Sequence, residues 1–168
     1  MTTEDAASAG VFALEQIYDA PAALVYRAWT NAEQLALWWG PEGMTIRVIE
    51  ADIRVGGSLH YVMGAGDFAM WGRFSFLELV PGERIVFVDS MIDEAGAPAR
   101  MPHAPEFPTR LLTTVVLNEA GGRTTLRLTV TPFEATAAEQ AAFDAMKHSI
   151  GGGYRGALGK LAGYLAVP

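Results

Sequence analysis

WWGPEGMTIRVIEADIRVGGSLHY, residues 38–61, joins a helical pattern to a strand pattern, and the rest of the chain is organised around it. Two tryptophans close a helical pattern, and Gly40-Pro41 stops it. From Met44 the apolar residues alternate with polar ones, as they do in a strand. Gly56-Gly57 predicts a turn, after which the chain starts back with Leu59 and Tyr61 on one side. The stretch therefore predicts a helix end, a strand, a turn and a second strand.

Upstream of this stretch, the sequence predicts a first strand and two short helices. Apolar and polar residues alternate over residues 11–18, which predicts the strand. Asp19-Ala20-Pro21 predicts a helix start, because a proline at the first position of a helix removes an N–H that has no partner within the helix. Residues 30–33 are typical of a capping box that begins the second helix. The order strand, helix, helix leads directly into the two tryptophans.

Downstream of the stretch, the sequence predicts more sheet. Four further regions are rich in β-branched and aromatic residues: 69–79, 84–91, 109–117 and 124–131. The alternation in the first of these slips near Phe76, which predicts a β-bulge there. Residues 93–108 contain four prolines, so we expect a long mobile loop over a cavity mouth.

The last part of the chain is the clearest amphipathic helix. Residues 136–139 form a capping box, and apolar residues recur at steps of three and four from Phe143 to Leu165. Six glycines between residues 151 and 163 each disfavour a helix by up to about 1 kcal/mol relative to alanine. They predict a kink, a close approach to the sheet, or space for a ligand.

These elements predict an α+β fold. A curved antiparallel sheet of about six or seven strands grips a long C-terminal helix, and two short helices follow the first strand. The helix is the only predicted element long enough to cover the apolar face of the sheet. We expect residues 1–10 to be a flexible N-terminal lead and residues 11–168 to form one domain.

Composition narrows the class of protein. Apolar residues make up 51% of the 168 residues and charged residues 18%, which is typical of a globular chain. The formal net charge is −7 without a basic cluster, so nucleic acid and anionic membrane surfaces are poor partners. There is no cysteine, and residues 1–10 do not have the pattern of a signal peptide, so we expect a cytoplasmic protein.

An ordered set of short motifs resembles the START-like (SRPBCC, helix-grip) superfamily. The set consists of residues 20–30, 38–41, 50–57, 72–78, 81–86, 124–126 and 153–161. The branch that looks closest contains proteins similar to the C-terminal domain of the activator of heat-shock protein 90 ATPase. Tyr154 departs from that pattern, which usually has tryptophan there. The resemblance implies a cavity between the sheet and the last helix that holds a hydrophobic molecule.

The candidate cavity lining is an apolar and aromatic set on the strands and the last helix. Strand parity and helix spacing select it, and methionines adapt to irregular ligands. A filled core would use the same residue types. The set consists of Trp39, Leu59, Tyr61, Met63, Met70, Phe74, Phe76, Met146, Ile150 and Tyr154.

Polar residues give no strong catalytic or metal pattern. Strand parity places His60 opposite the apolar set, and helix spacing turns His148 outward or sideways, whereas His103 lies in the proline-rich loop. Their spacing does not match a metal motif, and we expect no metal and no cofactor. Glu50 and Asp52 share a strand face, which is most simply a solvated one. Asp67, Arg73 and Arg110 could each place a charge in the cavity or in solvent.

The sequence leaves the function between three classes. The first is a domain that binds a small hydrophobic or aromatic molecule in a closed cavity of several hundred Å³. The second is an enzyme of cyclase, dehydratase or hydrolase type, which requires a titratable side chain in that cavity. The third is a chaperone-associated or regulatory interaction module. A homodimer is compatible with all three.

Overall fold

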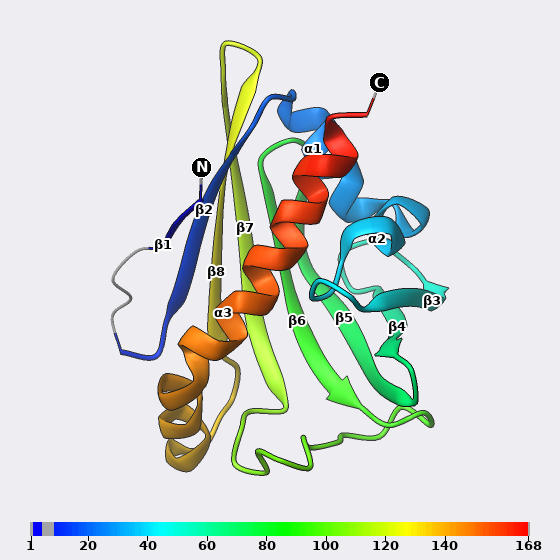
Figure 1. Cartoon of the computed structure of the whole chain (residues 1–168), viewed down its shortest axis with the longest axis vertical. Coiled ribbons are helices and arrows are strands. Elements are labelled where there is room, and N and C mark those ends of the chain that lie inside the picture. The colour runs from blue at the N-terminus through cyan, green and yellow to red at the C-terminus, as the bar shows by residue number, and fades with distance from the viewer. Residues whose placement is uncertain (1, 5–8, 168) are drawn as a thin grey trace.

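The fold is a curved antiparallel sheet with a long helix across one face (Figure 1). The computed structural model describes residues 2–4 and 9–167. Within them the sheet has eight strands in the order β1-β2-β8-β7-β6-β5-β4-β3. The strands are β1 (Thr2–Glu4), β2 (Phe12–Tyr18), β3 (Thr45–Ala51), β4 (Ser58–Ala65), β5 (Phe68–Val80), β6 (Arg84–Ile92), β7 (Arg110–Ala120) and β8 (Arg123–Pro132).

Hairpins connect the strands from β3 to β8, and the last of these strands pairs with β2 from the start of the chain. Strands β3 to β8 pair with their neighbours in chain order, and β2 pairs with β8. The β5–β6 register shifts between Phe76 and Glu78, which confirms the predicted bulge. Within residues 1–10, where a flexible lead was expected, Thr2–Glu4 pairs with β2, and residues 5–8 lie outside the described residues. The seven long strands agree with the predicted sheet.

Helices α1 (Ala22–Thr30) and α2 (Ala32–Trp38) cover one end of the sheet (Figure 1). The side chain of Asn31 accepts a hydrogen bond from the Gln34 N–H and caps α2. The predicted capping box at residues 30–33 is therefore wrong: the Thr30 hydroxyl donates back to the Tyr26 carbonyl, and Asn31 is the N-cap. The Trp38 indole N–H donates to the Ala28 carbonyl at 3.0 Å, which joins the two helices.

Helix α3 (Ala137–Leu165) lies diagonally across the concave face of the sheet (Figure 1). The predicted capping box of Thr136 and Glu139 is confirmed. The Tyr18 hydroxyl donates to the Leu158 carbonyl at 3.1 Å and holds the helix to β2. Gly151 permits the closest approach, because a Cβ there would lie 2.6 Å from the Phe12 ring. This glycine confirms the predicted close approach to the sheet.

Candidate ligand pocket

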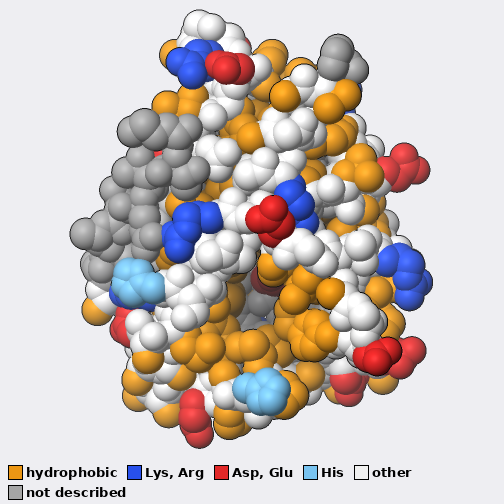
Figure 2. All heavy atoms as spheres, in the orientation of Figure 1, with side chains coloured by type: hydrophobic (Ala, Val, Ile, Leu, Met, Phe, Trp, Pro, Cys, Tyr) orange, Lys and Arg blue, Asp and Glu red, His pale blue; other side chains and the backbone are white. Residues whose placement is uncertain are grey.

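A pocket of about 400 Å³ lies between the sheet and the middle of α3. It opens to the surface, where Figure 2 shows a hollow among hydrophobic side chains. This differs from the expected closed cavity, although the expected volume agrees. The walls come from β4, β5, β6, β7, α3 and two loops: Trp39, Gly40, Pro41, Tyr61, Met63, Met70, Trp71, Asp89, Ser90, Met91, Met101, Phe107, Pro108, Thr109, Leu111, Ser149, Ile150, Gly153, Tyr154 and Ala157.

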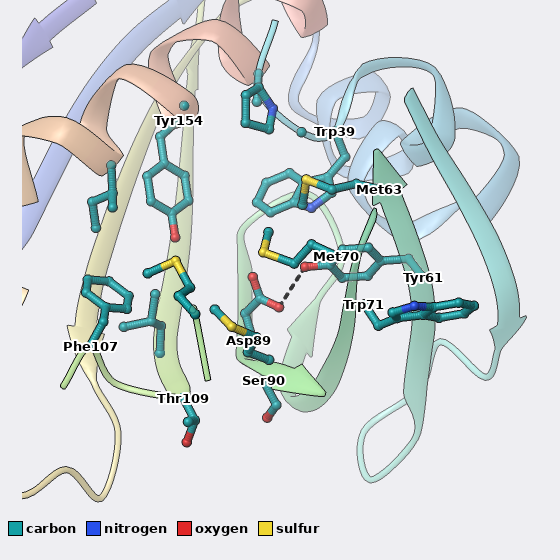
Figure 3. Close-up of a pocket in the computed structure, with 18 of the residues that line it drawn as sticks. Trp39, Tyr61, Met63, Met70, Trp71, Asp89, Ser90, Phe107, Thr109 and Tyr154 are labelled. Atoms are coloured by element: carbon teal, nitrogen blue, oxygen red, sulfur yellow. Dashed lines mark hydrogen bonds between the residues drawn. The ribbon is translucent and has the colours of Figure 1, made fainter. Parts of the chain in front are cut away.

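Six of the ten residues predicted for the cavity line this pocket. They come from the loop after α2, from β4 and β5, and from α3, so the sheet and the helix both contribute as the resemblance implies. Figure 3 shows the labelled ones facing a common space. The six are Trp39, Tyr61, Met63, Met70, Ile150 and Tyr154.

The other four predicted residues lie outside the pocket lining, and three of them are in the packed interior. Leu59, Phe74 and Phe76 are buried with 2% exposure or less. Met146 packs against the same core from the first half of α3. Their inward orientation was predicted correctly, but strand parity does not say how far along a strand the packing ends and the pocket begins.

Tyr61 reaches across the sheet to Asp89 over a glycine. Tyr61 on β4 pairs with Gly72 on β5, and β5 separates β4 from β6. A Cβ at Gly72 would lie 2.2 Å from the Tyr61 ring. Because Gly72 has no side chain, the ring lies over β5, and the Tyr61 hydroxyl donates to Asp89 Oδ1 at 3.0 Å (Figure 3). The glycine thus positions the hydroxyl.

Asp89 is the carboxyl group of the pocket. It lies on β6, opposite Leu111 of β7, and its side chain points into the pocket (Figure 3). Burial raises the pKa of Asp89 from 3.8 to about 7, and the Tyr61 hydrogen bond partly opposes that rise. Since burial disfavours the charged form, Asp89 is poised to gain or lose a proton near neutral pH.

The polar groups of Trp39 and Tyr154 lie near this pair, and Thr113 lies beside Tyr154. Burial raises the pKa of Tyr154, and the negative charge of Asp89 adds to that effect. The Trp39 indole N–H faces the Tyr61 oxygen and lowers the pKa of Tyr61, which burial and Asp89 raise. Trp39 Nε1 and Thr113 Oγ1 are buried, and neither makes a hydrogen bond of normal geometry. The apolar pocket therefore contains a small polar centre.

The loop between β6 and β7 forms one side of the pocket, as predicted for residues 93–108. Phe107 is buried and packs near Phe143 of α3, with ring centroids 6.1 Å apart. Arg100 connects the loop to α3 through an ion pair of 2.8 Å with Glu139. The Thr136 N–H and then Arg100 lower the pKa of Glu139. The loop was predicted to be mobile, and these contacts hold it against α3.

The three histidines lie outside the pocket lining. His60 is half-buried on the opposite side of β4 from Tyr61, and its ring lies 5.7 Å from the Trp71 ring. This confirms the orientation predicted from parity. His103 and His148 are exposed. The loop position of His103 does not bring its side chain into the lining.

The candidate charges of the sequence also lie elsewhere. Glu50 and Asp52 are exposed, and Asp52 pairs with Arg54 at 2.9 Å, which agrees with a solvated face. Arg110 pairs with Glu134 at 2.9 Å. None of the remaining candidates contributes to the lining: Asp67, Arg73 and Arg110.

Sequence reasoning missed Asp89, although a signal was present. Ile85, Phe87, Asp89 and Met91 share one parity on β6, so the aspartate occupies an inward position of an otherwise apolar strand face. Met101 and Phe107 could not be found in this way, because they lie in an irregular loop where no periodicity applies.

The described residues contain neither a metal-binding cluster nor a membrane-spanning helix. No group of three or more histidine, aspartate or glutamate side chains in residues 2–4 and 9–167 could hold a metal ion. Across the same residues, no helix has both the length and the hydropathy needed to cross a membrane.

The sheet, the covering helix and the pocket between them define a helix-grip domain of the START-like class, and solved structures share this fold. A protein from Arthrobacter aurescens is 26% identical with a TM-score of 0.83, and the match covers 99% of this chain and 92% of that one. A protein from Chromobacterium violaceum is 26% identical with a TM-score of 0.74, over 95% and 99% of the two chains. An AHSA1 protein from Silicibacter pomeroyi, 19% identical with a TM-score of 0.72 over 94% and 98%, shows the fold alone.

The amino-acid sequence establishes the family of this chain. Residues 19–166 match the model for Activator of Hsp90 ATPase homolog 1-like proteins. The chain belongs to this family, as its motifs predicted. No curated protein matches the sequence.

Proposed function

We propose that this protein binds a small hydrophobic or aromatic molecule in the pocket between the sheet and α3. The observation that carries the proposal is a pocket of about 400 Å³ with a mainly apolar lining. Ligand sites are typically concave, mostly apolar and provided with a few polar groups that orient the ligand. Asp89, Tyr61 and Tyr154 are such groups.

The walls suit a ligand of irregular shape. Four methionines line the pocket: Met63, Met70, Met91 and Met101. Flexible thioether side chains adapt to different apolar surfaces, whereas the rings of Trp39 and Tyr154 supply rigid contact area. A planar bicyclic molecule therefore fits the lining.

A pocket-filling variant tests the proposal. The probe is naphthylmethanol, a neutral aromatic alcohol, and binding is measured by isothermal titration calorimetry. Ile150→Trp places a large ring in the pocket wall and is expected to abolish binding. His148→Trp adds the same ring at an exposed position on the same helix and is expected to leave binding unchanged.

Two outcomes would contradict the proposal. One is that the wild-type protein takes up no naphthylmethanol. The other is that Ile150→Trp binds the probe as well as His148→Trp does, which would place the binding site elsewhere. Circular dichroism of both variants establishes that each is folded.

A second candidate function is an enzyme of the cyclase, dehydratase or hydrolase type that uses the same pocket. Asp89 favours it, because it is a titratable group with a strongly raised pKa inside an apolar pocket. Its carboxylate would take a proton from a carbon next to a carbonyl, while the Tyr154 hydroxyl donates to the carbonyl oxygen. Wild-type protein should then speed deuterium exchange at the α-carbon of tetralone, and Asp89→Asn should not.

The predictions of a cytoplasmic location, of a homodimer and of a chaperone-associated or regulatory partner remain proposals. The acidic net charge of −7 supports a protein without nucleic-acid partners. Sedimentation of the purified chain would measure its oligomeric state.

A further inference from the structure

The ionisable groups of the pocket are all acidic. Three contribute to the described lining, one from each of three elements: Tyr61 of β4, Asp89 of β6 and Tyr154 of α3. The lining from β5, β7 and the loop after β6 contains no ionisable side chain, and no lysine, arginine or histidine is part of the lining. An anionic ligand would thus have no cation to meet there.

Two basic side chains close to the lining in the chain, Arg110 and Lys160, make contacts with other groups. Arg110, between the lining residues Thr109 and Leu111, pairs with Glu134 at 2.9 Å. Lys160 of α3 donates to the Trp39 and Pro41 carbonyls at 3.5 and 3.3 Å. Burial and the Tyr61 hydrogen bond account for the shifted pKa of Asp89, with no contribution from a cation. Within the described lining, the Asp89 carboxylate is therefore a half-buried charge without a counter-ion.

One oxygen of Asp89 remains available to a ligand. Oδ1 accepts the Tyr61 hydrogen bond, and within the described residues the carboxyl makes no second one. Figure 3 shows the other oxygen directed away from the Tyr61 hydroxyl and into the pocket. A carboxylate partly shielded from water is stabilised by a charged donor in hydrogen-bond contact, so the best complement to Asp89 is a protonated nitrogen.

Aromatic rings border the space in front of this oxygen. Trp39 and Tyr154 lie with ring centroids 6.2 Å apart, and Phe107 forms part of the opposite wall (Figure 3). The negative face of an aromatic ring attracts a cation, most strongly for tryptophan and where water is excluded. The methionines and Ile150 leave the remaining volume to an apolar body.

From this geometry we infer that the pocket selects hydrophobic amines: molecules with an apolar, aromatic body and one protonated amino group that bonds to Asp89 Oδ2. The inference rests on the proposed function and specifies its ligand class. The order of affinity for one body is amine, then neutral alcohol, then carboxylate. The carboxylate is excluded because it would place a second negative charge beside Asp89.

A matched set of three probes tests this order. Naphthylmethylamine, naphthylmethanol and naphthoate share the same ring system and carry a cation, a neutral hydroxyl and an anion. In titration calorimetry at about pH 8, where Asp89 is mainly ionised, the amine is expected to bind roughly 10-fold to 100-fold more tightly than the alcohol. Naphthoate is expected to show no binding.

Variants assign the preference to Asp89. Asp89→Asn is expected to bind amine and alcohol equally. Glu50→Gln, which removes an exposed carboxylate on β3, is expected to keep the full preference for the amine. If Asp89→Asn does not fold, NMR titration of the Asp89 carboxyl in the wild-type protein replaces it, and the amine should lower the Asp89 pKa below about 7.

The preference should also depend on pH. The amine stays protonated between about pH 5 and pH 8, whereas Asp89 takes up a proton as the pH falls through about 7. The advantage of the amine over the alcohol is thus expected to shrink in acid, while the affinity for the alcohol stays constant.

The outcomes separate the inference from the proposed function. If the alcohol binds and the amine binds no more tightly, the pocket is a binding site and the inference is wrong. If naphthoate binds best, the charge argument is wrong. If none of the three binds, the proposed function fails together with the inference.

Discussion

The interior of this protein has two halves that are built on the same strands. In the packed half, Trp29 and Trp38 lie with ring centroids 4.7 Å apart, and Phe74 and Phe87 with centroids 4.2 Å apart. In the pocket half, Met63, Met70 and Tyr154 border an open space of about 400 Å³. The boundary falls within single strands, because Leu59 and Tyr61 are only one inward position apart on β4.

The difference shows how one face of a sheet can both stabilise a fold and leave room for a ligand. On β6, Phe87 completes the packed half, and the next inward residue, Asp89, belongs to the pocket. Close packing of large rings fills one half. In the other half Gly72 and Gly153 carry no side chain and so leave space. The Tyr61 ring lies across the sheet and does not fill the pocket.

The largest expected effect is a loss of stability from a substitution in the packed half. Leu59→Ala should lower the free energy of unfolding by about 2–5 kcal/mol, since it removes a fully buried side chain and leaves a cavity. Met70→Ala in the pocket half should cost clearly less, because the Met70 side chain already borders open space. Urea denaturation measures both. Equal losses would mean that the two halves are packed alike.

The next effect concerns the charge in the pocket half. Asp89 has a pKa of about 7 in the folded protein and 3.8 in its ordinary state. Between these pH values the folded protein holds a proton that the unfolded chain has released, so Asp89 makes stability fall as pH rises from about 4 to 7. Above about pH 7 the penalty is constant, at most about 4 kcal/mol.

Asp89→Asn removes that penalty. We expect the variant to be more stable than the wild type at about pH 8 and equal to it near pH 4, as measured by urea denaturation across this range. Glu50→Gln is the control for an exposed carboxylate. A gain from Asp89→Asn that is the same at every pH would contradict a raised Asp89 pKa.

A smaller effect is expected from a substitution at the boundary between the packed half and the pocket half. Gly72→Ala places a Cβ against the Tyr61 ring, which must move. Overpacking of this kind costs about 1–3 kcal/mol, and the displaced ring should lose its hydrogen bond to Asp89. NMR of the Tyr61 ring and of the Asp89 carboxyl reports both changes. Gly152→Ala, with no atom within 4 Å of the added Cβ, is the control.

The smallest expected effect removes one hydrogen bond. Tyr61→Phe keeps the ring but not the hydroxyl, at a cost of about 1 kcal/mol in stability. Because the Tyr61 hydrogen bond lowers the pKa of Asp89, the variant should raise that pKa above about 7. An NMR titration that shows an unchanged or lower pKa would mean that the hydroxyl does not hold the carboxylate.

The sequence predicted the architecture because local signals repeat along the chain. The turn at Gly56-Gly57, the bulge near Phe76 and the capping box at Thr136 each follow from local backbone chemistry, and the structure contains all three. The family motifs then placed the covering helix over the sheet, and residues 19–166 match that family.

The pocket could be predicted only in part. Tyr61 and Ile150 were found through parity and helix spacing, which say which way a side chain points. Phe74 points the same way but meets Phe87 in the packed half, and this depends on the neighbouring strand. Parity on β6 indicates the inward position of Asp89, but its raised pKa arises from desolvation by several elements, which no single strand encodes.

The methionine methyl groups report directly whether a ligand enters the pocket half of the interior. NMR of protein labelled at the methionine methyl groups follows both halves of the interior during titration with naphthylmethanol. Met63, Met70, Met91 and Met101 line the pocket, whereas Met44 and Met146 pack outside its lining. If the ligand binds in the pocket, the four pocket methyls show saturable shifts, and Met44 and Met146 stay nearly unchanged. Shifts spread equally over all six, or no shifts at all, would contradict binding in the pocket.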